Sequence, residues 1–589
     1  MDYYHFVSAR WLIKPEITLE TFKEKMKQVL QNPFLGQAGA DASERSAPQR
    51  FLIVGLGESG YAMAKWCLVQ GAFVRLADTR AHVELLTRQI GWLDDLQKLG
   101  LVDTCFESSD WSTLLDGIDV VGISPGLSPI QEPTFTLLSE CQKRNIAVWS
   151  EIEFFARGLY ALEAMAMAAE ERYKPSILAV TGTNGKTTTC ALTAQICERA
   201  GKHVALAGNI SPAALEKLLS VITKANNFIE LPEIWVLELS SFQLQFTYTL
   251  DPTAATVLNL SQDHLDWHGD MQAYAAAKAR ILGKNSVLVL NRDDEVVTAL
   301  FADEKESRKV IQFGSDSPVD IDSFGIERDP RAGGIDWLVW AGPDEATLAS
   351  ELEEAQEGFI KHKRRKKLDA YEKSDELRIK RLIPADALRI RGRHNALNAL
   401  AALALARAAG LGISPLLHGL REYQGEAHRV QTVAVIGDVE YIDDSKGTNV
   451  GATVAALHGL GSATGNKNIW LIVGGDGKGQ DFSPLVEPIT RFAKGIILIG
   501  RDAPVIEKVC AKAIEHHALE RICANSLESA VEQASQQAKA GDIVLLSPAC
   551  ASFDMFKDYK HRARIFEQAV QDLVHQASST ANDSLRASV

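Results

Sequence analysis

The chain has 589 residues, of which 46% are hydrophobic and 23% are charged, and its formal net charge is -14. A chain of this length exceeds a single hydrophobic core and predicts about two to four domains. The acidic balance disfavours nonspecific binding to nucleic acid, and no apolar run is long enough to cross a bilayer.

Charged residues interrupt the apolar ones in the opening stretch MDYYHFVSARWLIKPEITLE, which is unlike a secretory signal peptide. The 8 cysteines are scattered without a CxxC pair, which fits reduced thiols and argues against a zinc site or a disulfide framework. We therefore expect a cytoplasmic protein, and we expect it to be monomeric.

Apolar, strand-like runs alternate with helical stretches or glycine-rich turns along most of the chain. This alternation is typical of α/β domains with parallel sheets. The runs are 51–57 (FLIVGLG), 73–78 (FVRLAD), 120–124 (VVGIS), 176–182 (SILAVTG), 233–240 (EIWVLELS), 254–260 (AATVLNL), 286–291 (SVLVLN), 469–475 (IWLIVGG), 495–500 (GIILIG) and 542–547 (DIVLLS).

These runs fall into three α/β blocks. Small and polar residues near 36–49 predict a linker after an appended N-terminal segment, and the polar end of the chain predicts a disordered tail. The predicted segments are an N-terminal extension and linker at 1–48, a first domain at 49–165, a central domain at 166–425, a third domain at 426–577 and a tail at 578–589.

A highly charged segment at about 343–381 interrupts the central block, with acidic residues first and a basic cluster at 363–367. It can be interpreted as an arm that binds a partner or nucleic acid. A solvated helical insertion explains the same composition more simply, and we favour that interpretation.

The first block opens with a glycine pattern. Gly55, Gly57 and Gly60 form GxGxxG after an apolar run, and Asp78 ends the next run. Such glycines let a backbone approach a diphosphate at a helix N-terminus, and the acid can accept a ribose hydroxyl. A nicotinamide dinucleotide and a UDP-sugar both contain a diphosphate and a ribose, so either could bind here. A tight turn that binds no ligand is the third interpretation.

A second glycine pattern, TGTNGKTT at 181–188, follows the run at 176–182. It is shorter than the usual phosphate loop, which has four residues between its first glycine and the Gly-Lys pair. Backbone amides at the start of a helix bind phosphate, a lysine reaches the terminal phosphates, and the next hydroxyl suits Mg²⁺. The pattern predicts ATP binding by Gly182, Thr183, Asn184, Gly185, Lys186, Thr187 and Thr188.

Three charged or titratable residues lie downstream. Glu238 ends an apolar run, where it can hold a metal ion, position a nucleophile or cap a turn. His264 lies between two aspartates and can be a zinc ligand, a general base or structural, since Mg²⁺ prefers oxygen ligands. Lys278 lies on a helical segment, where most lysines are surface charges.

The order of the motifs resembles the Mur ligase family over nearly all of the chain from residue 51 to the 570s, and the short phosphate loop is normal in that family. The resemblance is greatest to the members that add D-glutamate. The motifs are TGTNGKTT, LELSSFQL, NLSQDHLDWH, YAAAKARIL, GRHNALNALAAL, AHRV, DDSKGTN, GGDGKGQDF and SPACASFDMFKDY.

The resemblance implies an ATP-dependent amide ligase of peptidoglycan precursor synthesis. The γ-phosphoryl group of ATP would activate the carboxylate of UDP-N-acetylmuramoyl-L-alanine, and the amine of D-glutamate would attack the acyl phosphate. The implied fold is a Rossmann-like UDP-binding domain, a central P-loop ATPase-type domain and a Rossmann-like third domain. The implied partners are small molecules and two Mg²⁺ ions, with no nucleic acid and no membrane insertion.

The resemblance also implies individual roles. Lys186 would contact the γ-phosphate; Thr187 and Glu238 would share one Mg²⁺, and His264 would bind the second; Lys278 would be carbamylated beside the metals. ATP would further be bound by Asn395, Asn398, Arg429 and Asp444, D-glutamate by Lys446, Thr448, Lys478, Ser552 and Tyr559, and the UDP-substrate by Ser59, Asp78, Thr79, Arg80, Ser124, Asn209 and Gln243.

The sequence departs from the family pattern at three positions. Tyr559 replaces an expected phenylalanine, Glu58 an apolar residue beside the uracil, and Trp267 an arginine. Three alternatives make different predictions. Another Mur or folylpolyglutamate-type ligase should lack the DDSKGTN and SPACASFDMF pair, and a nonenzymatic nucleotide-binding regulator should have lost the lysines and acids. An NAD-dependent oxidoreductase would not need the phosphate loop. We also expect the third domain to close on the central one.

Overall fold

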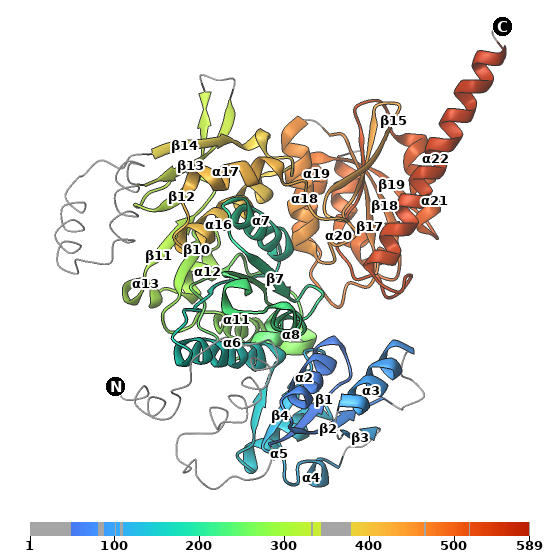
Figure 1. Ribbon diagram of the computed structural model, residues 1–589. Coiled ribbons are helices and arrows are strands. Elements are labelled where there is room, and N and C mark those ends of the chain that lie inside the picture. Colours follow the sequence, from blue (N-terminus) through green and yellow to red (C-terminus); the bar gives the residue numbers. More distant parts are fainter. Residues whose placement is uncertain are drawn as a thin grey trace.

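The computed structural model describes residues 49–80, 87–99, 102–106, 110–330, 334–342, 379–464, 467–517 and 519–587. Three sheets follow one another along the chain, with helices packed around each (Figure 1). The predicted N-terminal extension and residues 343–378 of the charged segment lie outside the described residues, whereas residues 379–381 begin a strand. Within the described residues, no helix combines the length and apolarity needed to span a membrane.

The first sheet has five parallel strands in the order β3-β2-β1-β4-β5. The order reverses between β1 and β4, and ligands of open α/β sheets bind at such a point, beyond the carboxyl ends of the strands. The elements are β1 (Arg50–Val54), α2 (Glu58–Val69), β2 (Phe73–Asp78), α3 (Thr87–Leu99), β3 (Val102–Phe106), α4 (Trp111–Leu114), β4 (Val120–Ile123), α5 (Thr134–Lys143) and β5 (Ala147–Trp149).

The middle sheet has nine strands in the order β14-β13-β12-β11-β10-β9-β6-β8-β7. Strands β6 to β12 pair in parallel, and β13 and β14 are antiparallel to their neighbours. The strands are β6 (Ser176–Thr181), β7 (Val204–Gly208), β8 (Ile234–Glu238), β9 (Ala254–Val257), β10 (Val287–Asn291), β11 (Val310–Phe313), β12 (Ser323–Asp329), β13 (Ile335–Ala341) and β14 (Ile379–Pro384).

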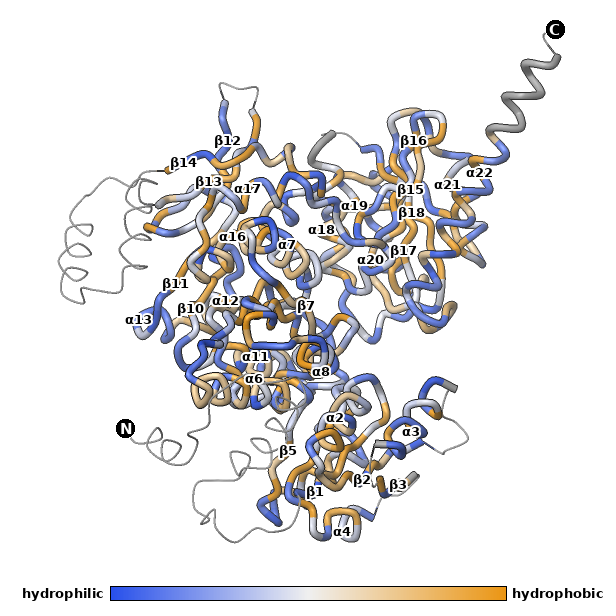
Figure 2. Tube along the Cα trace, in the orientation of Figure 1, coloured by the Kyte–Doolittle hydropathy of each residue, from blue (hydrophilic) through white to orange (hydrophobic). Residues whose placement is uncertain are grey.

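The helices of this middle region include α7, which follows β6 directly, and α16, which packs beside it. Hydrophobic residues gather along strands such as β10 and β11 (Figure 2), as expected of a sheet covered on both faces. The helices are α6 (Glu151–Ala168), α7 (Lys186–Arg199), α8 (Ala214–Lys224), α9 (Ser241–Leu244), α10 (Leu265–His268), α11 (Met271–Ala279), α12 (Glu295–Leu300), α13 (Glu304–Ser307), α16 (Arg393–Ala408) and α17 (Ile413–Glu422), with short 3-10 turns at Phe228–Glu230 and Ala385–Ala387.

The third sheet has six strands in the order β15-β16-β20-β17-β18-β19, all parallel except the β15–β16 hairpin. Its elements are β15 (Gln431–Ile436), β16 (Val439–Asp443), α18 (Val450–Thr464), β17 (Ile469–Gly474), a 3-10 turn (Ser483–Leu485), α19 (Val486–Phe492), β18 (Ala493–Ile499), α20 (Ala503–His516), β19 (Glu520–Cys523), α21 (Leu527–Gln537), β20 (Ile543–Leu546) and α22 (Tyr559–Ala587).

The ends of two predicted segments differ from the structure. The predicted boundary between residues 165 and 166 falls inside α6, which runs through to Ala168. Residues 578–587, for which the sequence predicts disorder, instead continue α22 to Ala587. The stretch 559–587 contains no glycine or proline, so no residue in it breaks the helix that begins at Tyr559.

One hydrophobic cluster extends from the first sheet into the middle one. It joins Trp66 of α2, Phe155 of α6, Leu218 of α8 and Trp235 of β8, and the rings of Phe155 and Trp235 meet edge to face at 5.0 Å. The clusters of the third region, by contrast, contain only residues of that region. The first and middle regions are therefore joined by continuous apolar packing.

Candidate functional site

The phosphate loop lies between β6 and α7, and β6 is the third strand from the β7 edge of the nine-stranded sheet. Gly182 and Gly185 have positive φ angles of 146° and 83°, which favour glycine. A Cβ on Gly185 would also approach Asn398 Oδ1 at 2.5 Å. This close fit brings α16, which carries the predicted ATP contacts Asn395 and Asn398, against the loop.

Lys186 is the first residue of α7, and its side chain lies along the loop. Its Nζ donates to the carbonyl oxygens of Gly182 at 2.9 Å and Thr183 at 2.8 Å. Burial lowers the pKa of Lys186, Glu238 works to raise it, and Arg429 lowers it further. The predicted loop residues Thr187 and Thr188 are buried in the first turn of the same helix.

Glu238 ends β8, beside β6, where its backbone pairs with Val180. Its Oε1 accepts a hydrogen bond from Asn209 Nδ2 at 3.1 Å. Its Oε2 is buried and has no hydrogen-bond partner among the described residues. An unpaired buried carboxylate oxygen beside a phosphate loop fits a Mg²⁺ ligand, because it would be costly without a cation.

His264 precedes α10 with a φ of 55°, and its Nε2 lies 3.5 Å from Asp263 Oδ2. Burial lowers the pKa of His264; Asp263 opposes this, and Lys478, Lys186 and Lys278 add to it. A neutral imidazole is the form that coordinates a metal. The structure therefore suits a metal ligand at His264 better than a permanently charged histidine.

Lys278 is almost fully buried on α11 and is not a surface charge. Its Nζ donates to Gly182 O at 2.9 Å and Thr181 Oγ1 at 3.4 Å, and it lies 4.6 Å from the centre of the Tyr274 ring. Burial and then the charge of Lys186 lower its pKa far below the usual value, against the opposing effect of Asp263 and Glu238. A neutral amine is the form that carbamylation requires.

An aromatic cluster that the sequence reasoning missed supports this segment. Phe242 lies 4.7 Å from His264 and 4.5 Å from Trp267, measured between ring centres. His268 Nε2 is 2.9 Å from Ser241 Oγ, and its ring lies 5.2 Å from Tyr274. Trp267, which departs from the family pattern, is buried and contributes packing at this position.

Two cations of the third domain reach the phosphate loop. Arg429 Nη2 donates to Thr187 Oγ1 at 2.9 Å, and Lys446 Nζ donates to the same oxygen at 3.1 Å. Burial lowers the pKa of Lys446 to about 8, and Arg429 adds to this effect. The start of α7 is therefore surrounded by positive charge from two domains, which suits the binding of a polyphosphate.

The other predicted nucleotide contacts lie at the same junction. Asn395 and Asn398 are buried at the start of α16, where Asn398 Nδ2 donates to Asn395 Oδ1 at 3.1 Å. Asp444 is buried as well and accepts a hydrogen bond from Ser547 Oγ at 2.7 Å. Burial raises the pKa of Asp444 to about 7, and the Ser547 hydrogen bond and Arg429 oppose this.

The residues predicted to bind D-glutamate come from three loops of the third domain and from the first residue of α22, which is Tyr559. Lys446 lies 5.8 Å from the centre of the Tyr559 ring. Lys478 is exposed, with a φ of 50°, while Ser552 is buried and Thr448 is half-buried. Lys446 donates to Thr187 Oγ1 of α7, so this part of the set faces the middle domain.

A pocket of about 480 Å³ lies at the switch point of the first sheet. Five of the residues predicted for the UDP-substrate line it, together with Glu58: they are Ser59, Asp78, Thr79, Arg80 and Ser124. Asn209 and Gln243 lie instead in the middle domain, where Asn209 contacts Glu238 and Gln243 forms a capping box with Ser240 at the start of α9.

Asp78 is held firmly within the first pocket. Its Oδ2 accepts from Leu56 N and from Arg80 Nη2, both at 2.7 Å, and its Oδ1 accepts from Arg80 Nε at 2.8 Å. Burial works to raise the pKa of Asp78, but the hydrogen bonds from Arg80 and Leu56 hold it below the usual value. Asp78 therefore stays ionised and holds Arg80 in place.

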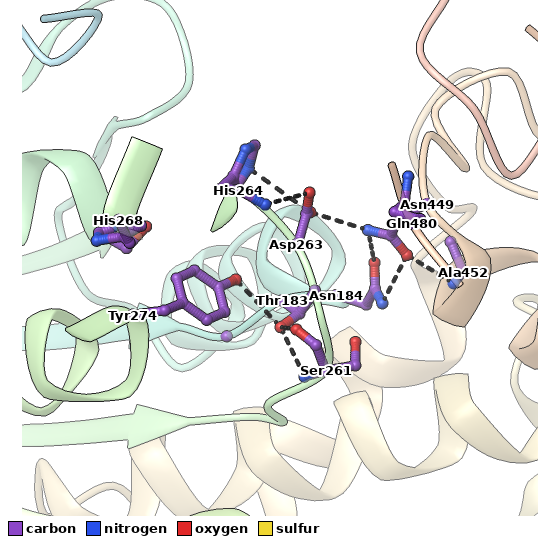
Figure 3. A network of polar contacts seen from close by, with 12 residues as sticks. Thr183, Asn184, Ser261, Asp263, His264, His268, Tyr274, Asn449, Ala452 and Gln480 are labelled. Carbon is purple, nitrogen blue, oxygen red and sulfur yellow. Dashed lines mark hydrogen bonds and ion pairs between the residues drawn. The ribbon is translucent and has the colours of Figure 1, made fainter. Parts of the chain in front are cut away.

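Asn449 is a further site residue that is not among those predicted from the sequence. Its side chain joins Asn184 of the phosphate loop and Asp263, and it caps the start of α18 by accepting from Ala452 N at 2.9 Å (Figure 3). An asparagine directly before a helix is a capping signal. That signal identifies the local role, but the contacts across the domains are visible only in the folded chain.

Two family models match the chain. The Mur ligase middle domain matches residues 180–406, and the Mur ligase glutamate ligase domain matches residues 428–550. The two matches cover the third sheet and, apart from the first residues of β6, the middle sheet, and they include both ends of the contact between Arg429 and Thr187.

Several curated proteins are similar over nearly the whole chain. UDP-N-acetylmuramoylalanine–D-glutamate ligase of Cupriavidus pinatubonensis is 52% identical over 89% of this chain and 96% of its own length. The protein of the same name from Paraburkholderia phymatum is 50% identical over 91% of this chain and 98% of its own length. Among solved structures, MurF from Acinetobacter baumannii shares the fold, with 14% identity, a TM-score of 0.52, and coverage of 94% of this chain and 98% of that one.

Proposed function

This chain belongs to the Mur ligase family, and from that premise we propose that it uses ATP to join D-glutamate to UDP-N-acetylmuramoyl-L-alanine. The reaction is a step of cytoplasmic peptidoglycan precursor synthesis, carried out by a monomer. Two relatives that are 52% and 50% identical to this chain are named UDP-N-acetylmuramoylalanine–D-glutamate ligase.

One observation carries the proposal. Arg429 and Lys446 of the third domain converge on Thr187 at the start of α7, close to Lys186 and to the unpaired carboxylate oxygen of Glu238. Positive charge from two domains around one phosphate loop is what a phosphoryl transfer requires, because negative charge spreads over the transferred group. An oxidoreductase has no use for such an arrangement.

The proposed chemistry has two steps. An oxygen of the L-alanine carboxylate attacks the γ-phosphorus of ATP, and ADP leaves. The amine of D-glutamate then attacks the carbonyl carbon of the acyl phosphate, loses a proton, and expels inorganic phosphate as the amide forms. The main tasks of the protein are to position the three reactants and to neutralise their charge.

Two Mg²⁺ ions would lower the charge repulsion between the phosphates and the attacking carboxylate. Thr187 and Glu238 would hold the first ion, and His264 and a carbamylated Lys278 would hold the second. The neutral amine that burial favours at Lys278, and the neutral imidazole that it favours at His264, support these roles.

The substrates are assigned to the domains as follows. The first domain would be a Rossmann-like UDP-binding domain, with Asp78 and Arg80 in its pocket. The middle domain, which would end near residue 425, would be the P-loop ATPase-type domain. The third would be a Rossmann-like domain at 426–577 that binds D-glutamate through Lys446, Thr448, Lys478, Ser552 and Tyr559, because cations and hydroxyls match a dicarboxylate.

The test is ATP-dependent phosphate release with UDP-N-acetylmuramoyl-L-alanine and D-glutamate, L-glutamate or L-lysine. Of the three amino acids, we expect only D-glutamate to give phosphate release. Release with a different amino acid would keep the ligase chemistry and overturn the substrate. No release with any pair would favour a nonenzymatic nucleotide-binding regulator.

A further inference from the structure

We propose that Asn449 is a positioning residue, which transmits the closure of the third domain to both the phosphate loop and the His264 segment. The proposal deepens the proposed function and rests on it, because it concerns how the ATP site becomes complete. In this role Asn449 does not contact ATP, Mg²⁺ or a substrate. It acts through Asn184 and Asp263, with which it forms hydrogen bonds (Figure 3).

The first link joins Asn449 to the phosphate loop. Asn184 Nδ2 donates to Asn449 Oδ1 at 3.1 Å, and Asn449 Nδ2 donates back to Asn184 Oδ1 at 3.0 Å. The pair spans 265 positions of the chain, and Asn449 is 95% buried, with 5% of its surface exposed. Reciprocal hydrogen bonds between two side-chain amides require a narrow range of distances and angles, so this part-buried pair sets the distance between α18 and the loop.

The second link leads to the proposed metal ligand. Asn449 Nδ2 also donates to Asp263 Oδ2 at 3.3 Å, and the other oxygen of Asp263 accepts from His264 N at 2.9 Å. His264 has a strained positive φ, which persists only where its surroundings hold it. Asp263 therefore connects the third domain directly to the backbone that aims His264.

The third link comes from the loop that carries Lys478. Val450, the residue next to Asn449, donates its backbone N–H to Gln480 Oε1 at 3.1 Å. Gln480 Nε2 in turn donates to Gly477 O at 3.0 Å. The start of α18 thus holds the Lys478 loop on one side and the phosphate loop on the other. A Cβ on Gly451 would meet Asn184 Nδ2 at 3.0 Å, which shows how closely the helix approaches that loop.

A purely local role for Asn449 makes a different prediction. Asn449 also caps α18, and aspartate caps a helix about as well as asparagine. An aspartate at this position, however, cannot donate to Asn184 or to Asp263, and it would place a second carboxylate beside Asp263. Capping alone predicts that Asn449→Asp is neutral, whereas the positioning role predicts that the closed state is weakened.

The experiment compares Asn449→Asp with the unaltered protein and with Asn449→Asp combined with Asp263→Asn. The measurements are kcat, the KM values for ATP and the UDP-substrate, and the Mg²⁺ concentration that gives half-maximal rate. We expect Asn449→Asp to lower kcat/KM for ATP by roughly 5–150-fold and to raise the Mg²⁺ requirement. The KM for the UDP-substrate and the thermal midpoint should stay close to those of the unaltered protein.

The double variant exchanges donor and acceptor, so that an amide at position 263 faces a carboxylate at position 449. It should recover a large part of the loss in kcat/KM for ATP. The proposal is overturned if Asn449→Asp is as active as the unaltered protein, if its loss follows a lowered thermal midpoint, or if the exchange recovers nothing.

A second measurement separates this proposal from the proposed function. Small-angle scattering records the radius of gyration with and without the ATP analogue AMP-PNP and Mg²⁺. The unaltered protein should contract, Asn449→Asp should contract less, and the double variant should contract again. This result is independent of which amino acid the enzyme joins, and equal contraction of all three proteins would overturn the positioning role.

Discussion

The two joints between the domains are built from different interactions. Between the first and middle domains, α2, α6 and α8 pack in one hydrophobic cluster. Between the middle and third domains, the contacts that reach the phosphate loop are polar, and they come from Arg429, Lys446 and Asn449.

The difference bears on which joint can move. Opening an apolar joint exposes buried hydrophobic surface to water, which costs free energy in proportion to its area. A polar joint exchanges its hydrogen bonds for bonds to water at a small net cost. The first joint therefore makes one stable body of two domains, and the second is suited to open and close around ATP.

Trp66→Ala tests the apolar joint and should have the largest effect. The ring of Trp66 packs where Gly158 of α6 meets Leu218 of α8. The space there is so narrow that a Cβ added to Gly158 would lie 2.9 Å from both Trp66 and Leu218. We expect a loss of about 3–5 kcal/mol in the free energy of unfolding. In calorimetry, the transitions of the first and middle domains should separate.

The control for this variant is Trp111→Ala. Trp111 is equally buried but belongs to a cluster confined to the first domain. Its removal should destabilise the first domain without moving the transition of the middle one. If Trp66→Ala behaves in the same way, the cluster does not couple the two domains.

Arg429→Ala tests the polar joint. It removes a cation that donates to Thr187 from the third domain, and loss of one such donor costs about 10²–10³-fold in kcat. The thermal midpoint should change little, because Arg429 belongs to no hydrophobic cluster. Arg421→Ala, an exposed arginine on α17, is the matched control, and an equal loss of rate in the two variants would contradict the assignment.

Glu151→Gln sharpens the description of the apolar joint. Glu151 accepts a hydrogen bond from Leu215 N of α8, and its Oε2 is buried with no partner among the described residues. Burial raises its pKa to about 7, against the opposing Leu215 hydrogen bond. The folded state therefore holds a proton that the unfolded chain releases near pH 4.5, and stability is lost as the pH rises from about 4.5 to about 7.

Removing the charge should therefore stabilise the protein by about 1–3 kcal/mol at about pH 8 and by less at about pH 5. Glu153→Gln, two residues along α6, is the control with the opposite sign. Glu153 is buried too, but it receives hydrogen bonds from Arg157, Tyr248 N and Thr249 N. A gain from Glu151→Gln that is equal at both pH values would contradict the assigned pKa.

Lys446→Arg should have the smallest effect, on the pH dependence of D-glutamate use. The pKa of Lys446 is lowered to about 8 by burial and then by Arg429, so its positive charge is lost above that pH. The guanidinium of an arginine stays charged. We compare kcat/KM for D-glutamate of the unaltered protein with that of the variant. The value for the unaltered protein, divided by the value for the variant, should fall roughly 25-fold from about pH 7.5 to about pH 9.5.

This ratio cancels the titration of the D-glutamate amine, which both proteins share. A ratio that does not change with pH would show that Lys446 keeps its charge, or that its charge is not needed for binding D-glutamate.

All ten apolar runs found in the sequence form strands that pair in parallel with their neighbours. Continuous apolar residues suit strands that are buried on both faces, and so the runs identify the central strands. The strands that were not predicted are mostly antiparallel or at sheet edges, such as β13, β14 and β15. Strand β15, for example, has no buried residue, so its structure depends on its partner and not on its own pattern.

The sequence by itself determined the two glycine loops, because a strand, a glycine turn and a helix N-terminus are neighbours along the chain. It also indicated which acids and cations could serve the site, through the order of the motifs. Only the tertiary structure decided which of them meet. Arg429 reaches Thr187 across 242 positions, and Asn449 reaches Asn184 across 265. Such contacts depend on how whole domains pack, and no local propensity specifies that.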